Sequence, residues 1–253
     1  MSGLLRRRIG WARKSIYFFA LHKGGSSVLA SMLGRVGMQH RDYALEIYRG
    51  ARPELVFPDR GCAFGPLRLS SRKGEEGALV ERVTQASFLE DKHCVVMVRD
   101  PRDILVSAFH SFGFSHGLSD NPQIREQQEA DRARIQVTTL DRYVVERAPE
   151  WCVAFDRVER VLESARRSTL VSFEEMVDDF DRFARKLARQ LPLPPAALRE
   201  LYARTRPRET EAPSEHKRSG RVGGFREKLE PETIEQLNEI LKVPLTRFGY
   251  SLN

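Results

Sequence analysis

Five consecutive residues near the N-terminus combine one positive charge, two glycines and two hydroxyl groups. They are Lys23, Gly24, Gly25, Ser26 and Ser27, and they stand between an apolar run and a segment with helical spacing. Glycines let backbone N–H groups approach an anion closely, and a helix N-terminus adds partial positive charge. The segment therefore predicts a loop that binds a phosphate or sulfate group. A tight turn with an incidental lysine is the alternative.

The order of residues in this loop differs from that of the P-loop nucleotide triphosphatases. Their loop carries lysine after its last glycine and before a serine or threonine that holds magnesium. Here Lys23 precedes both glycines. The sequence therefore does not support the magnesium-holding arrangement, although a P-loop nucleotide kinase or NTPase stays open as an alternative function.

A second candidate anion site follows another apolar run. Arg99 comes directly after that run, and Ser107 lies eight residues later in a predicted helix, Pro101–Phe112. An arginine at the carboxyl end of a strand points into the crevice where open α/β sheets bind ligands. Guanidinium and hydroxyl groups together suit a phosphate. Alternatively, Arg99 pairs with Asp100 or Asp103 and stabilises the turn.

A third segment, near the C-terminus, is basic and rich in glycine. It covers residues 217–226 (KRSGRVGGFR) and includes Arg218, Ser219 and Gly220. The backbone N–H and guanidinium groups of such a loop suit an anion. The same composition is also typical of an exposed, disordered segment.

Short apolar runs alternate with segments of helical spacing along the chain. The predicted strands are Ser15–Leu21, Cys62–Leu69, His93–Val98 and Thr169–Val171. The predicted helices are Val28–Met38, Leu79–Phe88, Pro101–Phe112, Leu140–Arg147, Val153–Ala165, Phe173–Leu191, Ala196–Thr205 and Pro231–Leu241. Residues 50–78 otherwise look like loop, and residues 117–137 like a loop or an exposed helix. The alternation predicts an α/β fold in three layers, with a central parallel sheet flanked by helices.

The overall composition limits the class of protein. The chain has 253 residues, of which 41% are hydrophobic, and this predicts a single domain over residues 1–253. Three cysteines without metal-binding spacing argue against a disulfide framework and favour a reducing compartment, the cytoplasm. No apolar stretch is long enough to predict a membrane span. The net charge of +7 favours anionic partners.

Together, and in this order, the three segments resemble those of the PAPS-dependent sulfotransferases (PAPS is 3′-phosphoadenosine-5′-phosphosulfate). Residues 23–27 look like the loop that holds the 5′-phosphosulfate in that family. Residues 99–107 look like its 3′-phosphate segment, and residues 218–223 like its Arg-x-Gly-x-x-Gly loop. Residues 172–176 (SFEEM) resemble a turn that the family shares. The resemblance implies a P-loop-NTPase-like sulfotransferase fold and in-line transfer of a sulfuryl group from PAPS to a hydroxyl or amine acceptor.

The resemblance also implies roles for single residues. Lys23 would stabilise the charge that develops on the leaving phosphate, the product being adenosine 3′,5′-bisphosphate (PAP). No metal is expected. The donor-binding residues that it implies are Lys23, Gly24, Gly25, Ser26, Ser27, Arg99, Ser107, Arg218, Ser219 and Gly220.

The acceptor group needs a general base, for which the sequence offers three candidates. Glycan-modifying members of the family use a glutamate downstream of the loop lysine, and Glu46 lies 23 residues after Lys23, so it is the first choice. His110 is the second choice, because histidine is common at that position in the family. His22, which adjoins Lys23, is a third option.

The acceptor itself is left open between a small molecule, a lipid and a glycan. Residues 40–75 and 112–140 are expected to contribute loops to its pocket. Nucleic acid is not expected as a partner, and the oligomeric state is not indicated. A non-catalytic polyanion-binding protein on the same scaffold remains an alternative, which a steep salt dependence of binding without turnover would favour.

Overall fold

The computed structural model describes residues 13–34, 37–71, 74–191, 195–205 and 221–252. Two compact units can be distinguished in it. Unit 1 comprises the described residues of Met1–Val98 and Arg157–Arg206, and unit 2 those of Arg99–Asp156 and Pro207–Asn253. The single domain expected over residues 1–253 stays a prediction.

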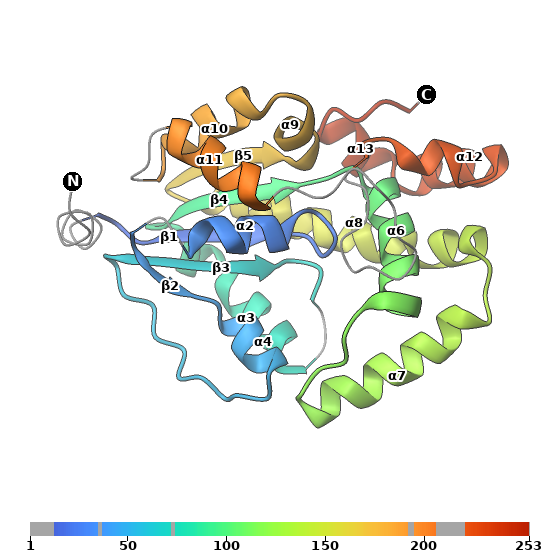
Figure 1. Cartoon of the computed structure of the whole chain (residues 1–253), viewed down its shortest axis with the longest axis horizontal. Helices are drawn as coiled ribbons and strands as arrows, with labels where there is room; N and C mark the ends of the chain where they lie inside the picture. The colour runs from blue at the N-terminus through green and yellow to red at the C-terminus, as the bar shows by residue number, and fades with distance from the viewer. Residues whose placement is uncertain (1–12, 35–36, 72–73, 192–194, 206–220, 253) are drawn as a thin grey trace. The chain divides into compact units, whose positions relative to one another are not determined.

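Unit 1 contains a five-stranded sheet in which every neighbouring pair of strands is parallel. The strands are β1 (Ile16–Ala20), β2 (Gln39–Arg41), β3 (Cys62–Arg68), β4 (His93–Val98) and β5 (Arg167–Ser172). Their order across the sheet is β2-β3-β1-β4-β5 (Figure 1). The parallel sheet predicted from the sequence is confirmed, and β2 is the strand that the sequence did not predict.

Alternate residues of the central strand face two different layers. Ile16, Phe18 and Ala20 belong to a buried cluster with residues of four helices. These helices are α2 (Ser26–Leu33), α9 (Phe173–Asp178), α10 (Phe180–Ala188) and α11 (Pro195–Thr205). Tyr17 points to the opposite face, where its ring stacks on Phe64 with centroids 4.8 Å apart. Because both faces are covered, the central strand β1 is apolar and buried along its whole length.

The second face of the sheet is covered by short helices. They are α3 (Tyr43–Tyr48), α4 (Gly74–Val83) and α5 (Ala86–Leu89). The ring of Phe57, from the segment between α3 and β3, contacts those of Tyr43, Phe64 and Phe88. Residues 40–75, which were expected to contribute loops to the acceptor pocket, thus also contain α3 as well as β3, and β3 was an expected strand.

The carboxyl ends of β1 and β4 are neighbours, since Ala20 pairs with Met97. The chain leaves β1 toward β2 and β3 on one side, whereas β4 and β5 lie on the other side. A reversal of this kind is the place where open parallel sheets bind ligands. Residues 21–25 follow β1 at this point, and Arg99 follows the last residue of β4.

Unit 2 is built from helices. They are α6 (Pro101–His110), a π-helix η1 (Ser111–Ser115), α7 (Pro122–Gln136), the part of α8 (Leu140–Ser164) before Arg157, a 3-10 helix η2 (Gly224–Glu227), α12 (Pro231–Ile240) and α13 (Lys242–Arg247). Residues 117–137 thus contain a helix, which was one of the two expected states. None of the described helices is both long and apolar enough to cross a membrane.

Two helix boundaries differ from the sequence-based predictions. Leu140–Arg147 and Val153–Ala165 were expected to be separate helices, but α8 is continuous through Pro149. Its buried residues Val144, Ala148, Trp151 and Phe155 recur every three to four positions, so packing of one apolar face outweighs the cost of the proline. Conversely, Phe173–Leu191 was expected to be one helix.

The break in that second segment has a local cause. Asp179 ends α9 and caps α10, because its carboxylate accepts a hydrogen bond from the backbone N–H of Arg182 at 3.0 Å. Aspartate is a preferred N-cap residue, so the chain starts a new helix there.

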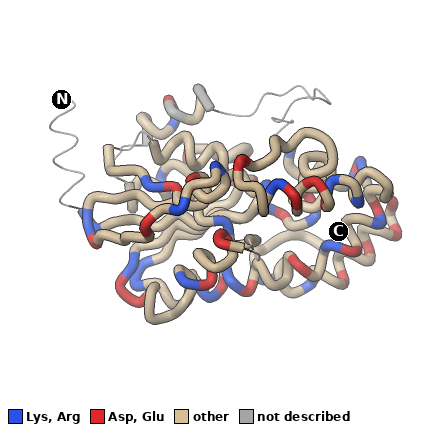
Figure 2. The backbone as a smooth tube through the Cα atoms, turned by 90° about the horizontal axis from the view of Figure 1, so that it is seen from below, with Lys and Arg blue, Asp and Glu red and all other residues tan. Residues whose placement is uncertain are grey.

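Charged residues of both signs are interspersed along the described chain (Figure 2). All three cysteines are free.

Candidate functional site

The loop after β1 contains two residues in the left-handed backbone conformation. Lys23 has φ +61° and Gly25 has φ +92°, so two left-handed residues flank Gly24. The N–H of Gly24 donates to the carbonyl of Leu21 at 3.0 Å and closes the turn. Lysine rarely adopts positive φ, and such strain is typical of functional sites. Alternation of conformations of this kind turns successive backbone N–H groups toward one point.

Helix α2 begins directly after this loop. Gly25 is its N-cap, and the first turn contains no acidic side chain. The first backbone N–H groups of a helix have no partner within the helix and carry partial positive charge. Ser26 is buried and Ser27 is exposed. Lys23 through Ser27 therefore lie together in unit 1, at the N-terminus of α2.

Gly25 is required by its surroundings as well as by its φ angle. A Cβ atom at Gly25 would lie 2.7 Å from Met97 Cε and 3.0 Å from Phe173 Cδ2. Gly25→Ala is therefore expected to lower the free energy of unfolding by about 1–3 kcal/mol, measured by urea denaturation. Gly117→Ala is the control, since a Cβ there meets nothing within 4 Å. Equal effects of the two substitutions would contradict the prediction.

Arg99 lies in unit 2, just before Asp100, the N-cap of α6, and is 9% exposed. Its Nη2 donates to the carbonyl of Arg221 at 3.2 Å and lies 3.7 Å from Asp103 Oδ2. The pairing with Asp103, one of the two alternatives left by the sequence, is thus present. It does not exclude anion binding, because a guanidinium has five N–H donors.

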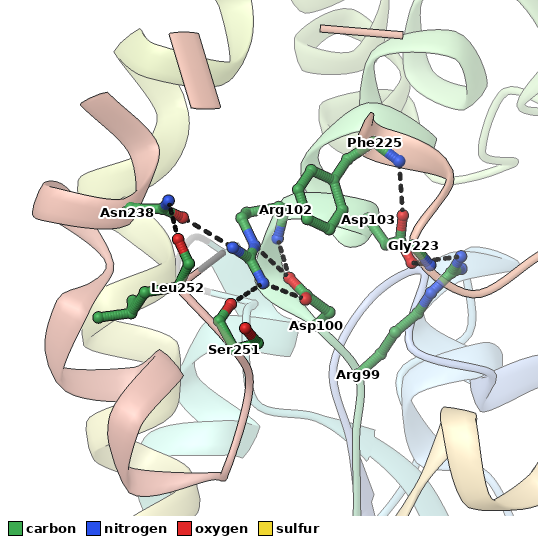
Figure 3. Close-up of polar contacts among 9 residues, drawn as sticks. All are labelled: Arg99, Asp100, Arg102, Asp103, Gly223, Phe225, Asn238, Ser251 and Leu252. Carbon is green, nitrogen blue, oxygen red and sulfur yellow. Dashed lines mark hydrogen bonds and ion pairs between the residues drawn. The ribbon is translucent and has the colours of Figure 1, made fainter. Parts of the chain in front are cut away.

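Asp103 holds the described part of the third segment against α6. Its Oδ2 accepts from the backbone N–H of Gly223 at 2.8 Å, and its Oδ1 accepts from that of Phe225 at 3.0 Å (Figure 3). Burial raises the pKa of Asp103 above its usual value, and the Arg99 charge opposes that rise. Arg218, Ser219 and Gly220 lie outside the described residues.

Arg102 is 1% exposed and ties distant parts of unit 2 together. Its Nη2 donates to Asp100 Oδ2 at 2.7 Å and to the carbonyl of Ser251 at 2.8 Å. Its Nη1 donates to Asn238 Oδ1 at 2.7 Å, and its guanidinium lies 4.2 Å above the ring of Phe225 (Figure 3). This network fixes the N-terminus of α6, where Arg99 is attached.

Three polar residues share one face of α6. Asp103, Ser107 and His110 stand at i, i+4 and i+7, which is the spacing of one helix face. Ser107 and His110 are both partly exposed. Ser107 and His110 therefore lie on the same face of α6 as Asp103. Asp103 is the residue that accepts hydrogen bonds from Gly223 and Phe225.

Glu46 belongs to the other unit. It lies in the first turn of α3 and is partly exposed. His22 lies in the loop after β1, where its Nδ1 is 2.7 Å from Ser70 Oγ. Among the described residues, no group of three or more His, Cys, Asp or Glu side chains is placed to hold a metal ion.

Unit 2 also contains a pocket of about 290 Å³ between η1, α7 and α8. Phe112, Ile135 and Tyr143 form its apolar lining, and Arg132 and Arg147 are among its polar residues. Burial raises the pKa of Tyr143 to about 12, so its hydroxyl is neutral at physiological pH.

Helix α7 is fastened to the π-helix by side chains that reach its carbonyls. Arg132 Nε donates to the carbonyl of Phe112 at 3.3 Å, and Gln136 Nε2 donates to that of Gly113 at 2.9 Å. A π-helix frequently marks a functional site.

Sequence reasoning gave the pairing of Asp103 with Arg99 as an alternative, and the i,i+4 spacing supports that pairing. It missed the hydrogen bonds that Asp103 accepts from Gly223 and Phe225, and it missed the burial of Arg102. The partners of Arg102 include Asn238 and Ser251, which are far away in sequence, so no local pattern identifies it as buried.

One protein family and several solved structures are similar to this chain. A family model described as "Sulfotransferase domain" matches residues 79–249. The crystal structure of mouse sulfotransferase SULT7A1 complexed with PAP is similar to this chain, with 16% identity, a TM-score of 0.58, and coverage of 96% of this chain and 89% of that one. Retinol dehydratase, solved with androsterone and inactive cofactor PAP, shows 13% identity, a TM-score of 0.50, and coverage of 96% and 85%. No curated protein sequence matches the chain.

The similarity to these two solved structures supports the fold class. Both neighbours are α/β proteins that contain a parallel sheet of the P-loop-like kind, and unit 1 has such a sheet. The fold class predicted from the sequence is therefore confirmed.

Proposed function

The chain belongs to the sulfotransferase domain family, and on that premise we propose that it transfers a sulfuryl group from PAPS to a hydroxyl or amine acceptor. The observation that carries the proposal is the loop after β1, in which left-handed Lys23 and Gly25 precede the N-terminus of α2. This arrangement suits a phosphosulfate group.

Each unit, taken by itself, offers residues whose chemistry suits one anionic group of the donor. A Cβ atom at Gly24 would lie 3.1 Å from the carbonyl of Leu21, so a side chain at this position would be crowded. Arg99 is oriented by Asp103 and by the carbonyl of Arg221. We assign the 5′-phosphosulfate to residues 23–27 and the 3′-phosphate to Arg99 and Ser107. Arg218, Ser219 and Gly220 remain proposed partners of the 3′-phosphate.

The donor supplies an activated sulfuryl group, and the protein supplies position and charge. Lys23 places its ammonium at the oxygen that bridges sulfur and the 5′-phosphate, where negative charge develops during transfer. The N–H groups at the start of α2 hold the remaining oxygens. No metal ion is included in this proposal.

The acceptor proton needs a base, and the sequence favours Glu46 first and His110 second. Glu46→Gln and His110→Asn remove the basic atom while preserving approximate size. Both assignments stay predictions.

For the acceptor, we propose a small molecule with an apolar body. The pocket lined by Phe112, Ile135 and Tyr143 has the size and the mixed lining of a small-molecule site. Residues 112–140 were expected to contribute to an acceptor pocket, and two of these three residues lie in that range. A lipid or glycan acceptor, a cytoplasmic location and the absence of a nucleic-acid partner remain predictions.

Calorimetric titration of PAP, without added metal, tests the donor site directly. The wild type is expected to bind PAP, and Arg99→Ala is expected to weaken binding by about 10²-fold, because a charge-assisted bond to phosphate contributes about 1.5–3 kcal/mol. Arg99→Lys retains the charge but not the planar fork, so an intermediate affinity is expected.

Arg142→Ala is the control for this titration, since Arg142 is an exposed residue of α8 that pairs with Glu146. Failure of the wild type to bind PAP would contradict the proposal. Binding of ATP with magnesium would then favour a kinase or NTPase. Binding of heparin with a steep salt dependence would favour a polyanion-binding protein.

A further inference from the structure

One arginine of the pocket in unit 2 is held by backbone carbonyls. Arg132 of α7 donates from Nε to the carbonyl of Phe112 at 3.3 Å, and its Nη2 donates to the carbonyl of His116. These two acceptors stand near the two ends of η1. A guanidinium has five N–H groups, so the two bonds fix its plane and leave further N–H groups for another partner.

The other charged side chains of the pocket lining already have partners of opposite sign. The pairs are Asp131 with Arg134, Glu146 with Arg142, and Arg147 with Glu150. Within the described part of the chain, Arg132 takes part in no ion pair of this kind. The lining contains three arginines and two carboxylates, so Arg132 adds a positive charge that the pocket itself does not neutralise.

The remaining walls of the pocket suit an apolar body. Ile135 and Tyr143 are buried, and the ring of Phe112 lines the pocket beside them. A positive charge next to such walls attracts an anion more strongly than it would in water, because the local dielectric constant is lower. The combination of apolar walls with one oriented guanidinium is complementary to an amphipathic molecule that has one anionic group.

The pocket adjoins the end of α6 within unit 2. Phe109, the residue before the last one of α6, contacts the ring of Tyr143 with centroids 5.4 Å apart. The π-helix η1 follows α6 without an intervening residue and supplies Phe112 to the pocket. The helix that carries Ser107, which we assigned to the 3′-phosphate, therefore continues directly into a wall of this pocket.

Resting on the function proposed above, we propose that the acceptor is a hydroxyl-bearing carboxylic acid with an apolar body, and that Arg132 selects it by binding its carboxylate. The hydroxyl group reacts with the donor, whereas the carboxylate only anchors the molecule. A guanidinium binds a carboxylate through two parallel N–H bonds, which fix orientation as well as affinity. Arg132 is thereby a specificity-determining residue of the pocket.

Matched pairs of phenols test for the anionic group without any substitution in the protein. The acids are p-hydroxyphenylacetate, p-hydroxyphenylpropionate and p-hydroxycinnamate, and each is compared with its primary amide, which keeps the body and the hydroxyl but not the charge. Calorimetric titration into the full chain, with and without PAP, is expected to favour the acid by about tenfold or more in the pair that fits best. Equal affinities within every pair would overturn the proposal.

Substitution of Arg132 tests the origin of that preference. Arg132→Met is expected to weaken binding of the acid by about tenfold or more and to leave that of the amide nearly unchanged. Arg132→Lys keeps the charge without the planar fork, so an intermediate preference is expected. An undiminished preference in Arg132→Met would overturn the proposal. Equal losses for acid and amide would do so too, because they indicate that Arg132 only holds α7 against η1.

Arg125→Met is the matched control for these substitutions. Arg125 also belongs to α7 and donates from Nε to a backbone carbonyl, that of Ser119 at 2.9 Å, but it is not among the residues that line the pocket. Its substitution is expected to leave the preference for the acid unchanged. Circular dichroism verifies the folding of each variant, and the comparison of acid with amide in the wild type does not depend on any of them.

Initial rates with labelled PAPS connect the pocket to the reaction. The preferred acid is expected to have a KM about tenfold or more below that of its amide at a similar kcat, since the anchor lies away from the reacting hydroxyl. Lack of PAP binding by the wild type would contradict the proposed function, whatever the preference for the acid. Normal PAP binding with a higher kcat/KM for the amide than for the acid would overturn only the inference about the acceptor.

Discussion

Lys23→Met is expected to lower kcat for sulfuryl transfer by about 10²–10³-fold, since it removes the cation from the oxygen on which charge develops. PAP affinity is expected to fall by about tenfold or less, because the backbone N–H groups of the loop and of α2 remain. Methionine has a similar length and no β-branch, so it meets the φ of +61° with no more strain than lysine. The measurement pairs calorimetry of PAP with initial rates on whichever acceptor turns over in a screen with labelled PAPS.

The informative quantity is the difference between the loss in kcat and the loss in PAP affinity. A residue that binds donor and transition state equally would lower affinity and rate by the same factor. Lys242→Met serves as the control, because Lys242 is an exposed residue of α13 with one long ion pair to Glu239. An unchanged kcat in Lys23→Met would remove Lys23 from the chemistry and leave it a structural role in the turn.

Arg102→Met is expected to lower the free energy of unfolding by about 3–5 kcal/mol. The substitution leaves the carboxylate of Asp100 buried without its cation, and it removes the donors that reach Asn238 and Ser251. Both side chains of the pair are almost fully buried, so solvent screens the lost interaction very little. Urea denaturation followed by circular dichroism measures the change.

Two further variants test the cause of that loss. Arg142→Met removes an exposed arginine that pairs with Glu146 and is expected to cost less than about 1 kcal/mol. The double substitution Asp100→Asn with Arg102→Met is expected to be more stable than Arg102→Met alone, since no unpaired charge stays buried. If Arg102→Met were as stable as Arg142→Met, the network of Figure 3 would contribute little to folding.

The central strands were predictable because burial on both faces leaves a continuous apolar run. His93–Val98 was expected as a strand and is β4. Strand β2 was not expected, since its three residues Gln39, His40 and Arg41 are polar and lie at the edge of the sheet. Helices α3 and α13 are too short to give a periodic signal.

The candidate site was predictable only where its residues are contiguous. Lys23 to Ser27 form a turn and the start of α2, and their chemistry follows from their residue types. Arg99 stands at a strand end that the apolar run reveals. The contact of Ser70 with His22 joins residues 48 positions apart. Likewise, Arg102 resembles a surface charge in the sequence, and only tertiary packing buries it. Contacts of this kind depend on the fold as a whole.

The carboxylate of Asp103 also bears on the rate at which the product leaves. Its Oδ2 lies 3.7 Å from Arg99 Nη2. The 3′-phosphate, bound as proposed, competes with Asp103 for the guanidinium of Arg99. The negative charge of Asp103 then offsets part of the attraction between Arg99 and the phosphate. If the proposed function holds, we therefore expect PAP to leave sooner than it would from a site without this carboxylate.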